Sequence, residues 1–190
     1  KSVAVADLDG DDEEDLAVAN SAATTVSILR GRGDGTFEDA EPIAVGAMPN
    51  HVIAVDLDGD GDQDLVTANS VGRTTSVLLN RGNGTFGAAV HYGTINPPDA
   101  VIAVDVDLDG TLDLVTSSES ASSVSVLVGG RGGGENVLFD LPYVLPSGRG
   151  PRFVIAGDLD ADGDPALSTN DRQGESVTVL YNRVDPGPGT

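Results

Sequence analysis

Short apolar segments alternate with acidic and glycine-containing segments along the chain, and the same order recurs four times. In the first unit, apolar residues 3–6 precede an acidic segment, residues 16–20 follow it, and residues 25–29 form a third, partly alternating segment. Equivalent first segments begin at Ile53, Ile102 and Ile155. β-branched residues and a period of two are typical of half-buried strands. A fourth, weaker apolar segment occurs at residues 43–45 and 89–92.

Four short strands in a unit of about 49 residues predict one blade of a β-propeller. We therefore expect an all-β fold in which residues 1–190 form a single repeat domain, with units at about residues 1–50, 51–99, 100–152 and 153–190. No segment shows a sustained helical period, which argues against a βαβ arrangement. The fourth unit ends in the proline- and glycine-rich residues 185–190, so we expect its outer strand to be missing.

The net charge of −21 is concentrated in four nine-residue segments, which start at Asp7, Asp56, Asp105 and Asp158. These segments hold 7, 5, 4 and 4 acidic residues, or 20 of the 31 in the chain, and contain no Lys or Arg. Carboxylates packed this densely repel one another unless cations neutralise them. Because no basic patch is present to meet phosphates, we expect no nucleic-acid partner. No apolar run is long enough to predict a membrane span.

The second acidic segment, residues 56–64, has the pattern of a calcium-binding loop. Carboxylates at positions 1, 3 and 5 can converge on one ion, and glycine at position 6 permits a sharp turn. Position 7 can offer its backbone carbonyl, and Asp at position 9 closes the shell. Oxygen ligands in a flexible loop suit Ca²⁺ better than zinc or copper, and Mg²⁺ prefers to keep its waters. An EF-hand would need Glu at position 12, where Thr67 stands, and flanking helices, where this chain has predicted strands.

The four segments predict three strong calcium sites and a weaker fourth. Asp12 replaces the glycine of the first segment, which is expected to strain its turn, and Ala166 replaces the closing carboxylate of the fourth. We expect the fourth site to bind most weakly, or to be completed by Asp164 or water. The predicted metal-ligating residues are Asp7, Asp9, Asp11, Glu13 and Asp15; Asp56, Asp58, Asp60, Asp62 and Asp64; Asp105, Asp107, Asp109, Thr111 and Asp113; and Asp158, Asp160, Asp162 and Asp164.

The second unit, with its acidic loop at residues 56–64 and the Asn-Gly-Thr-Phe turn at residues 83–86, resembles the FG-GAP or VCBS-type repeats of bacterial surface proteins and integrin α-subunit propellers. The resemblance covers essentially the whole chain. It implies that the acidic loop joins the first two strands of a blade and binds Ca²⁺ through the aspartates named above. An extracellular or cell-surface location is expected accordingly. Propellers of this family often have about seven blades, whereas this chain has four units.

Four units leave two arrangements open, a small closed propeller or an arc that needs another chain for closure. An incomplete fourth blade would leave an exposed sheet edge, which is a template for a strand from another chain. We therefore expect self-association, or a neighbouring chain that completes the last blade, and a structural or adhesive function. The alternative is a lectin-like module that binds glycans between blades. The scarcity of aromatic residues, with no Trp, three Tyr and four Phe, disfavours this alternative.

No catalytic constellation is evident, and we do not expect an enzyme. His51 and His91 are the only histidines and do not recur between units, the chain has no cysteine, and the clustered carboxylates are needed for metal. The Arg-Gly-Asp tripeptide at residues 32–34 and the sequon at Asn83 occupy the same repeated glycine turn, so we interpret the tripeptide as a turn rather than an adhesion motif. The chain opens directly on a predicted strand, as a mature or trimmed chain would.

Overall fold

The structure is a computed structural model that describes residues 2–130 and 138–182, and all of its regular elements are strands. The first sheet contains β1 (Val3–Ala6), β2 (Asp15–Asn20), β3 (Thr25–Leu29) and β4 (Glu41–Ala44). The second contains β5 (Pro49–Val55), β6 (Asp64–Asn69), β7 (Thr74–Leu78) and β8 (Val90–Gly93). The third contains β9 (Ala100–Val104), β10 (Asp113–Ser118), β11 (Ser123–Leu127) and β14 (Tyr143–Pro146). The fourth contains β15 (Pro151–Gly157), β16 (Ala166–Asp171) and β17 (Ser176–Leu180).

Each sheet is antiparallel, with its strands paired in chain order and with β12 and β13 inserted between β11 and β14 of the third sheet, so each repeat of the sequence folds into one blade. The predicted all-β propeller of four blade-like repeats is confirmed. Within the described residues the fourth sheet has three strands, and residues 183–190, for which the sequence predicts no outer strand, lie outside the description. The third unit carries a small ribbon that the sequence did not predict, formed by β12 (Gly129–Gly130) and β13 (Leu138–Phe139). No helix in the described residues is long and apolar enough to cross a membrane.

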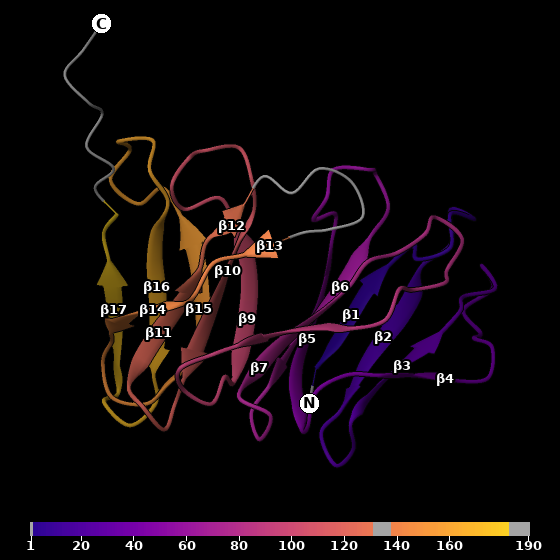
Figure 1. Cartoon of the computed structure of the whole chain (residues 1–190), viewed down its shortest axis with the longest axis horizontal. Helices are drawn as coiled ribbons and strands as arrows, with labels where there is room; N and C mark the ends of the chain where they lie inside the picture. Colours follow the sequence, from indigo (N-terminus) through magenta and orange to yellow (C-terminus); the bar gives the residue numbers. More distant parts are fainter. Residues whose placement is uncertain (1, 131–137, 183–190) are drawn as a thin grey trace, which may run out of the picture.

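The four sheets stand side by side in sequence order, from the first at the right of Figure 1 to the fourth at its left. The first strands contact one another in succession, β1 with β5, β5 with β9 and β9 with β15, as the inner strands of a propeller do. The first and fourth sheets lie at opposite ends of the row. The four blades therefore form an open arc rather than a closed ring.

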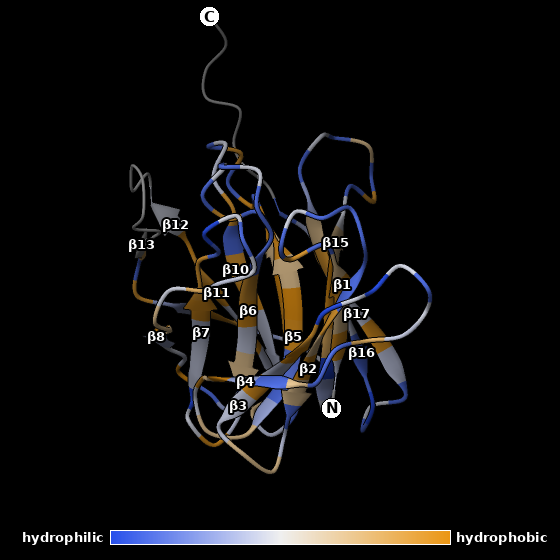
Figure 2. Cartoon of the chain, turned by 90° about the vertical axis from the view of Figure 1, so that its right-hand side faces the viewer, coloured by the Kyte–Doolittle hydropathy of each residue, from blue (hydrophilic) through white to orange (hydrophobic). Residues whose placement is uncertain are grey.

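Burial within the strands follows the position of each sheet in the arc. In β2 fully buried residues alternate with partly exposed ones, whereas every residue of β6 and of β10 is buried. The second and third sheets have a neighbour on both faces, and the first sheet has a neighbour on one face only, so period-two alternation survives only at the end of the arc. Figure 2 shows the apolar residues concentrated in the strands and the hydrophilic residues in the loops.

Three apolar clusters hold successive sheets together, one at each boundary. The first includes Ile28 from the first sheet and Leu65 from the second, and the second includes Val66 from the second sheet and Leu114 from the third. The core is thus divided among the boundaries rather than placed centrally. Full burial of one such side chain contributes about 1.5–3 kcal/mol.

Candidate metal centres

Four acidic loops join the first strand of each sheet to the second and lie along one edge of the arc, the upper edge in Figure 1. Loop 1 comprises residues 7–15, loop 2 residues 56–64, loop 3 residues 105–113 and loop 4 residues 158–166. Positions 1 to 9 are counted from the first aspartate of each loop.

The carboxylate at position 1 closes each loop by accepting the backbone N–H of position 6. The pairs are Asp7 with Asp12 (2.9 Å), Asp56 with Gly61 (3.0 Å), Asp105 with Gly110 (2.9 Å) and Asp158 with Gly163 (3.2 Å). Position 6 has a left-handed backbone in all four loops, with φ of 69°, 97°, 89° and 95°. Asp12 therefore adopts the conformation of the glycine it replaces, and this strain costs about 1 kcal/mol. The loop keeps its shape in spite of the substitution.

Position 4 also has a left-handed backbone, a requirement that the sequence analysis missed. Gly10 and Gly59 both have φ of 79°, whereas Leu108 and Ala161 have φ of 59° and 61°. Gly10 and Gly59 were the only features of the sequence that could have indicated a left-handed backbone at position 4. A leucine in this region carries a steric cost that glycine avoids. Loops 3 and 4 are therefore strained at position 4.

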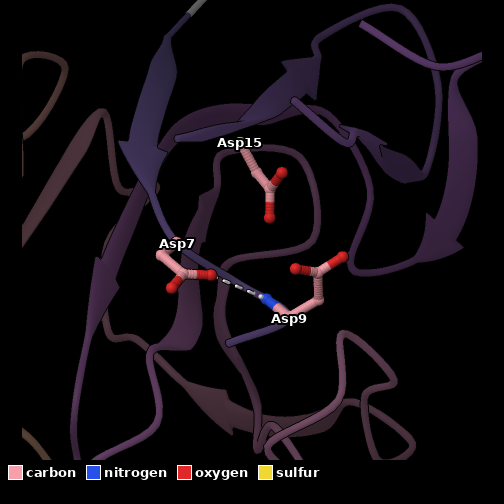
Figure 3. Close-up of side chains that lie close together, drawn as sticks. All are labelled: Asp7, Asp9 and Asp15. Atoms are coloured by element: carbon pink, nitrogen blue, oxygen red, sulfur yellow. Dashed lines mark hydrogen bonds between the residues drawn. The ribbon is translucent and has the colours of Figure 1, made fainter. Parts of the chain in front are cut away.

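Carboxylate oxygens converge in each loop to within 4.8 Å of one another. In loop 1 the converging side chains are Asp7, Asp9 and Asp15, shown in Figure 3, where an oxygen of Asp7 also accepts the N–H of Asp9. Positions 1, 3 and 9 likewise meet in loops 2 and 3, as Asp56, Asp58 and Asp64 and as Asp105, Asp107 and Asp113. In loop 4 the group is Asp158, Asp160 and Asp162, at positions 1, 3 and 5. Each loop thus offers three oxygen donors that could hold a metal ion.

The aspartate at position 9 is fixed by two backbone hydrogen bonds in loops 1 to 3. One carboxylate oxygen accepts the N–H of position 2, and the other accepts the N–H of the second residue after the third strand. The donors are Leu8 and Gly31 to Asp15, Leu57 and Asn80 to Asp64, and Val106 and Gly129 to Asp113, at 2.7–2.9 Å. Position 9 therefore ties its loop to the rest of the blade. Ala166 cannot form this tie in loop 4.

Positions 5 and 7 lie outside the converging groups of loops 1 to 3. The position-5 carboxylates of Asp11, Asp60 and Asp109 each accept the N–H of position 7 at 2.8–2.9 Å. A β-carbon added to Gly33 or Gly82 would lie 2.5 or 2.4 Å from a carboxylate oxygen of Glu13 or Asp62. These position-7 side chains therefore rest against the glycine turn of their own blade. The hydroxyl of Thr111 donates to Asp109 at 2.5 Å.

The predicted ligand at position 7 is the backbone carbonyl, not the side chain. The position of the side chain does not test this ligand, which stays a prediction. In loop 4 the carboxylate of Asp162 at position 5 accepts the N–H of Asp164 at 3.0 Å, as in the other loops. Unlike its counterparts in loops 1 to 3, Asp162 also belongs to the converging group. The complete ligand set of each loop and the identity of the ion also stay predictions.

Burial and crowding disfavour the charged form of several of these carboxylates. Burial raises the pKa of Asp64 to about 6, against the bonds from Asn80 and Leu57, which act to lower it. Burial also raises the pKa of Asp9, and the nearby Asp15 and Asp11 carboxylates raise it further. The pKa values of Asp58, Asp113 and Asp160 are also raised, mainly by desolvation. Neighbouring aspartates raise them further, and backbone hydrogen bonds act in the opposite direction. A bound cation would relieve this repulsion.

Asp9 provides a direct test of whether a cation fits loop 1. Its Oδ1 is buried and has no hydrogen-bond partner, and its Oδ2 lies 3.3 Å from Nε of Arg30. A buried carboxylate oxygen without a partner is costly, and a cation held by the converging oxygens of Asp7, Asp9 and Asp15 would satisfy it. An all-oxygen donor set of this kind suits Ca²⁺. Asp7, Asp9 and Asp15 would hold the ion, which would supply two positive charges to offset their own.

The glycine turn after β3 accounts for the Arg-Gly-Asp tripeptide. The carboxylate of Asp34 accepts the N–H and the hydroxyl of Thr36, at 2.9 and 2.6 Å, and the guanidinium of Arg32 donates to the carbonyl of Phe37 at 2.6 Å. Asn83 makes the same two bonds with Thr85 in the second blade. Both turns therefore use this side chain to close the loop on itself.

Solved structures with the same fold are found among larger proteins. The chain matches an Agrocybe aegerita lectin, described as specifically recognising non-reducing terminal N-acetylglucosamine, with a TM-score of 0.59 and 22% identity over 95% of this chain and 52% of the lectin. It matches the Photorhabdus luminescens Tc holotoxin pore with a TM-score of 0.50 and 21% identity over 88% of this chain and 8% of that one. A V. cholerae biofilm matrix protein, Bap1, gives a TM-score of 0.47 at 18% identity over 95% of this chain and 30% of that protein.

The chain thus spans about half, or less, of each of these proteins. At these identities the similarity to the lectin and to the holotoxin pore shows the fold alone. A search of curated protein sequences finds no match.

The repeat itself identifies the family. A model of the FG-GAP-like repeat matches residues 7–67 and again residues 56–116, each time from the start of one acidic loop into the next blade. The two matches together cover more than half of the chain and reach into the third blade, and the fourth blade repeats the same loop position between its first two strands. The chain belongs to the FG-GAP-like repeat family.

Proposed function

We propose that this chain is a calcium-stabilised structural or adhesive repeat module that works outside the cell or at the cell surface. The observation that carries the proposal is the recurrence of one converging aspartate group, at positions 1, 3 and 9, in three loops along the same edge of the arc. Four similar sites spread over four blades suit a structural role for the ion, and we assign them no catalysis.

Calcium would act by bracing each blade at its exposed edge. Position 9 begins the second strand and is tied by hydrogen bonds to position 2 and to the end of the third strand. An ion that also held positions 1 and 3 would link the end of the first strand to the other two. Extracellular modules commonly hold calcium with Kd values on the order of 10⁻⁴–10⁻³ M. The ion would therefore be retained at the calcium concentrations found outside cells.

Calorimetric titration of the ion-depleted chain with Ca²⁺, followed by thermal unfolding in Ca²⁺, Mg²⁺ and chelator, tests the proposal. We expect three calcium ions to bind with similar affinity and a fourth to bind more weakly. The melting temperature should rise in Ca²⁺ and much less in Mg²⁺. Asp107→Ala should remove one ion, whereas Asp140→Ala, an exposed acid outside the loops, should leave the stoichiometry unchanged. The same stability in all three solutions would rule out the proposed role of the ion.

A second candidate function is glycan binding, and a cavity at the opposite edge of the arc favours it. The cavity has a volume of about 430 Å³ and is lined by residues from all four blades: Ser2, Ser21, Asn50, His51, Asp99, Arg152 and Phe153. The ring of Phe153 is partly exposed and packs edge-on against His51, with ring centroids 5.9 Å apart. An exposed ring beside carboxylate, amide and guanidinium groups is a combination that binds sugars. The similar Agrocybe aegerita lectin recognises terminal N-acetylglucosamine, so that sugar is the first to test.

Saturation-transfer NMR with an oligosaccharide that ends in N-acetylglucosamine, in calcium, tests this second candidate. We expect saturable binding that Phe153→Ala abolishes and that Phe37→Ala preserves, since Phe37 lies in the glycine turn far from the cavity in sequence and fold. Absence of saturable binding to this and to a panel of other glycans would leave the structural proposal as the sole candidate.

A further inference from the structure

Every boundary between blades joins two different sheet faces. We call the face that a sheet turns toward the preceding sheet its leading face, and the opposite face its trailing face. In the second sheet the paired residues Leu65 and Leu78 belong to the leading face and are fully buried against the first sheet. Leu114 and Leu127 occupy the same paired positions in the third sheet and are buried against the second. A valine of the first strand joins each leucine pair in its cluster, Val52 in the second sheet and Val101 in the third.

The trailing face combines β-branched residues of the third strand with the apolar side chain at position 2 of the acidic loop. In the first sheet these residues are Val26, Ile28 and Leu8, all buried against the second sheet. In the third sheet Val124, Val126 and Val106 have the same places and are buried against the fourth. The same leading-to-trailing contact thus recurs three times within one chain.

Among residues 2–130 and 138–182, no sheet packs on the leading face of the first sheet. Val3 pairs with Val18 at the register position that Val52 and Thr67 occupy in the second sheet. The exposed fraction of Val3 is 53%, against 2% for Val52, and Val5 is 60% exposed. The leucine pair of this face, Leu16 with Leu29, is only half-buried.

The fourth sheet has a trailing face in the same condition. Val177 is 67% exposed, whereas Val26 and Val124, which share its register position, are completely buried. Leu159, at position 2 of loop 4, is 55% exposed, whereas Leu8 at position 2 of loop 1 is 2% exposed. Ile155 is also exposed on this face. Apolar patches of this kind mark interaction surfaces in soluble proteins.

We propose that the leading face of the first sheet in one copy of this chain binds the trailing face of the fourth sheet in a second copy. A second copy of the chain fits these faces because they resemble the internal boundaries between blades. The two exposed faces carry the same residue types, at the same register positions, as the three pairs of faces that already pack together. The exposed residues named on both faces are apolar and uncharged. The proposed surfaces are blade faces and differ from the outer strand edge of the fourth sheet, which β17 forms in the described residues.

The contact is heterologous, because the two faces are different, and heterologous contacts form closed rings or open chains. Two copies that use both faces would form a ring of eight blades, within the range of propellers, with a mass of 2 × 19.2 = 38.4 kDa. The net charge of −21 opposes association. Four bound Ca²⁺ ions would reduce it to −21 + 8 = −13, so association should strengthen in calcium. This calcium dependence rests on the proposed function, whereas the contact itself does not.

Light scattering coupled to size exclusion, in calcium and over a range of protein concentrations, tests the proposal with three variants. Val3→Asp places a charge on the leading face only, and Val177→Asp places one on the trailing face only. Val71→Asp is the matched control, because Val71 is equally exposed in the turn between β6 and β7 and lies on neither face. We expect the unmodified chain and the control to associate, and each face variant alone to run as a monomer with an unchanged circular dichroism spectrum.

Mixing the two face variants is the decisive step. Val3→Asp retains an intact trailing face and Val177→Asp an intact leading face, so their equimolar mixture should form a heterodimer, though neither variant associates alone. An unmodified chain that stays monomeric in calcium would overturn the proposal, as would a mixture that fails to associate. Calcium titration of the same samples separates the two ideas, since normal calcium binding by a monomer would refute the contact and leave the proposed function standing.

Discussion

Replacement of Asp64 by alanine should destabilise the protein much more in calcium than in its absence. Asp64 is fully buried at position 9 of loop 2 and accepts the N–H groups of Leu57 and Asn80 at 2.9 and 2.8 Å. It also belongs to the converging group with Asp56 and Asp58. The residue thus has two roles, to satisfy backbone donors and to hold the ion, and the two roles respond differently to removal of calcium.

The expected magnitudes follow from the environment of the carboxylate. Without calcium, the substitution leaves two buried N–H groups without acceptors, at about 1–3 kcal/mol each. It also removes a carboxylate whose pKa burial raises to about 6, and whose ionisation at neutral pH costs about 3 kcal/mol. These effects largely cancel and leave a loss of about 1 kcal/mol. In calcium at 100 times Kd, loss of the ion adds about 2.7 kcal/mol. The total should then be about 4 kcal/mol.

Urea unfolding at pH 7.5, in excess calcium and in chelator, measures both losses on the same samples. Gln63→Ala is the control, because Gln63 neighbours Asp64 in loop 2 and its side chain is outside the converging group. The control should lose less than about 0.5 kcal/mol in either solution. If Asp64→Ala lost the same free energy with and without calcium, Asp64 would be a backbone acceptor alone, and the assignment of position 9 as a ligand would be wrong.

Three further predictions test the loops. Ala166→Asp restores the carboxylate at position 9 of loop 4 and should increase the calcium affinity of the weakest site, measured by titration calorimetry. Leu108→Gly relieves the left-handed strain in loop 3 and should raise the free energy of unfolding in urea by about 1 kcal/mol; a decrease would show that the leucine side chain matters more than its backbone. The pKa of about 6 for Asp64 lies above its unfolded value of 3.8, so its contribution to ion-free stability is present below about pH 4 and lost as the pH rises through 6. Because protons compete with the ion, the added stability in calcium should show the opposite trend and shrink as the pH falls below 6; an effect of calcium that did not vary with pH would contradict this assignment.

The repeated pattern determines most of the fold because its signals are local. A β-branched segment, an acidic loop and an apolar segment predict a hairpin within each unit, and recurrence of the unit predicts the blades. The ribbon of β12 and β13 could not be predicted, since Gly129 and Gly130 carry no side-chain pattern. The sequence also could not predict that the arc is open, because this depends on how the first and fourth sheets lie relative to each other and not on any one segment.

The loops show a similar division. The spacing of aspartates predicted where carboxylates converge, but it did not predict which carboxylates accept backbone N–H groups. Asp11 and Asp60 accept the N–H groups of Glu13 and Asp62, and the side chain of Glu13 lies against the glycine turn of its own blade. These outcomes depend on which N–H groups the folded backbone presents. The requirement for a left-handed residue at position 4 was visible only in loops 1 and 2, where glycine is present.

In loops 1 and 3, position 2 couples the candidate ion site to the packing between blades. The N–H of Leu8 donates to Asp15, its side chain is buried between the first two sheets, and its carbonyl accepts the side-chain N–H of Asn80 from the second sheet at 2.8 Å. Val106 makes the same three contacts in loop 3. Its N–H donates to Asp113, its side chain is buried between the third and fourth sheets, and its carbonyl accepts the side-chain N–H of Asn182. Displacement of the ion should therefore loosen a blade boundary, and a loose boundary should weaken the ion site.

Loop 4 is the case in which this coupling can be measured. Leu159 at its position 2 is 55% exposed, and no sheet within the described residues covers that face of the fourth blade. Burial of Leu159 by a second copy would fix the loop in the way that Leu8 is fixed, even though Ala166 provides no carboxylate. The affinity of the fourth calcium should then increase with protein concentration, while the affinities of the other three stay constant. Titrations of Val177→Asp should show no such concentration dependence, and a fourth affinity that is equal in dilute and concentrated samples of the unmodified chain would show that position 2 does not transmit packing to the ion.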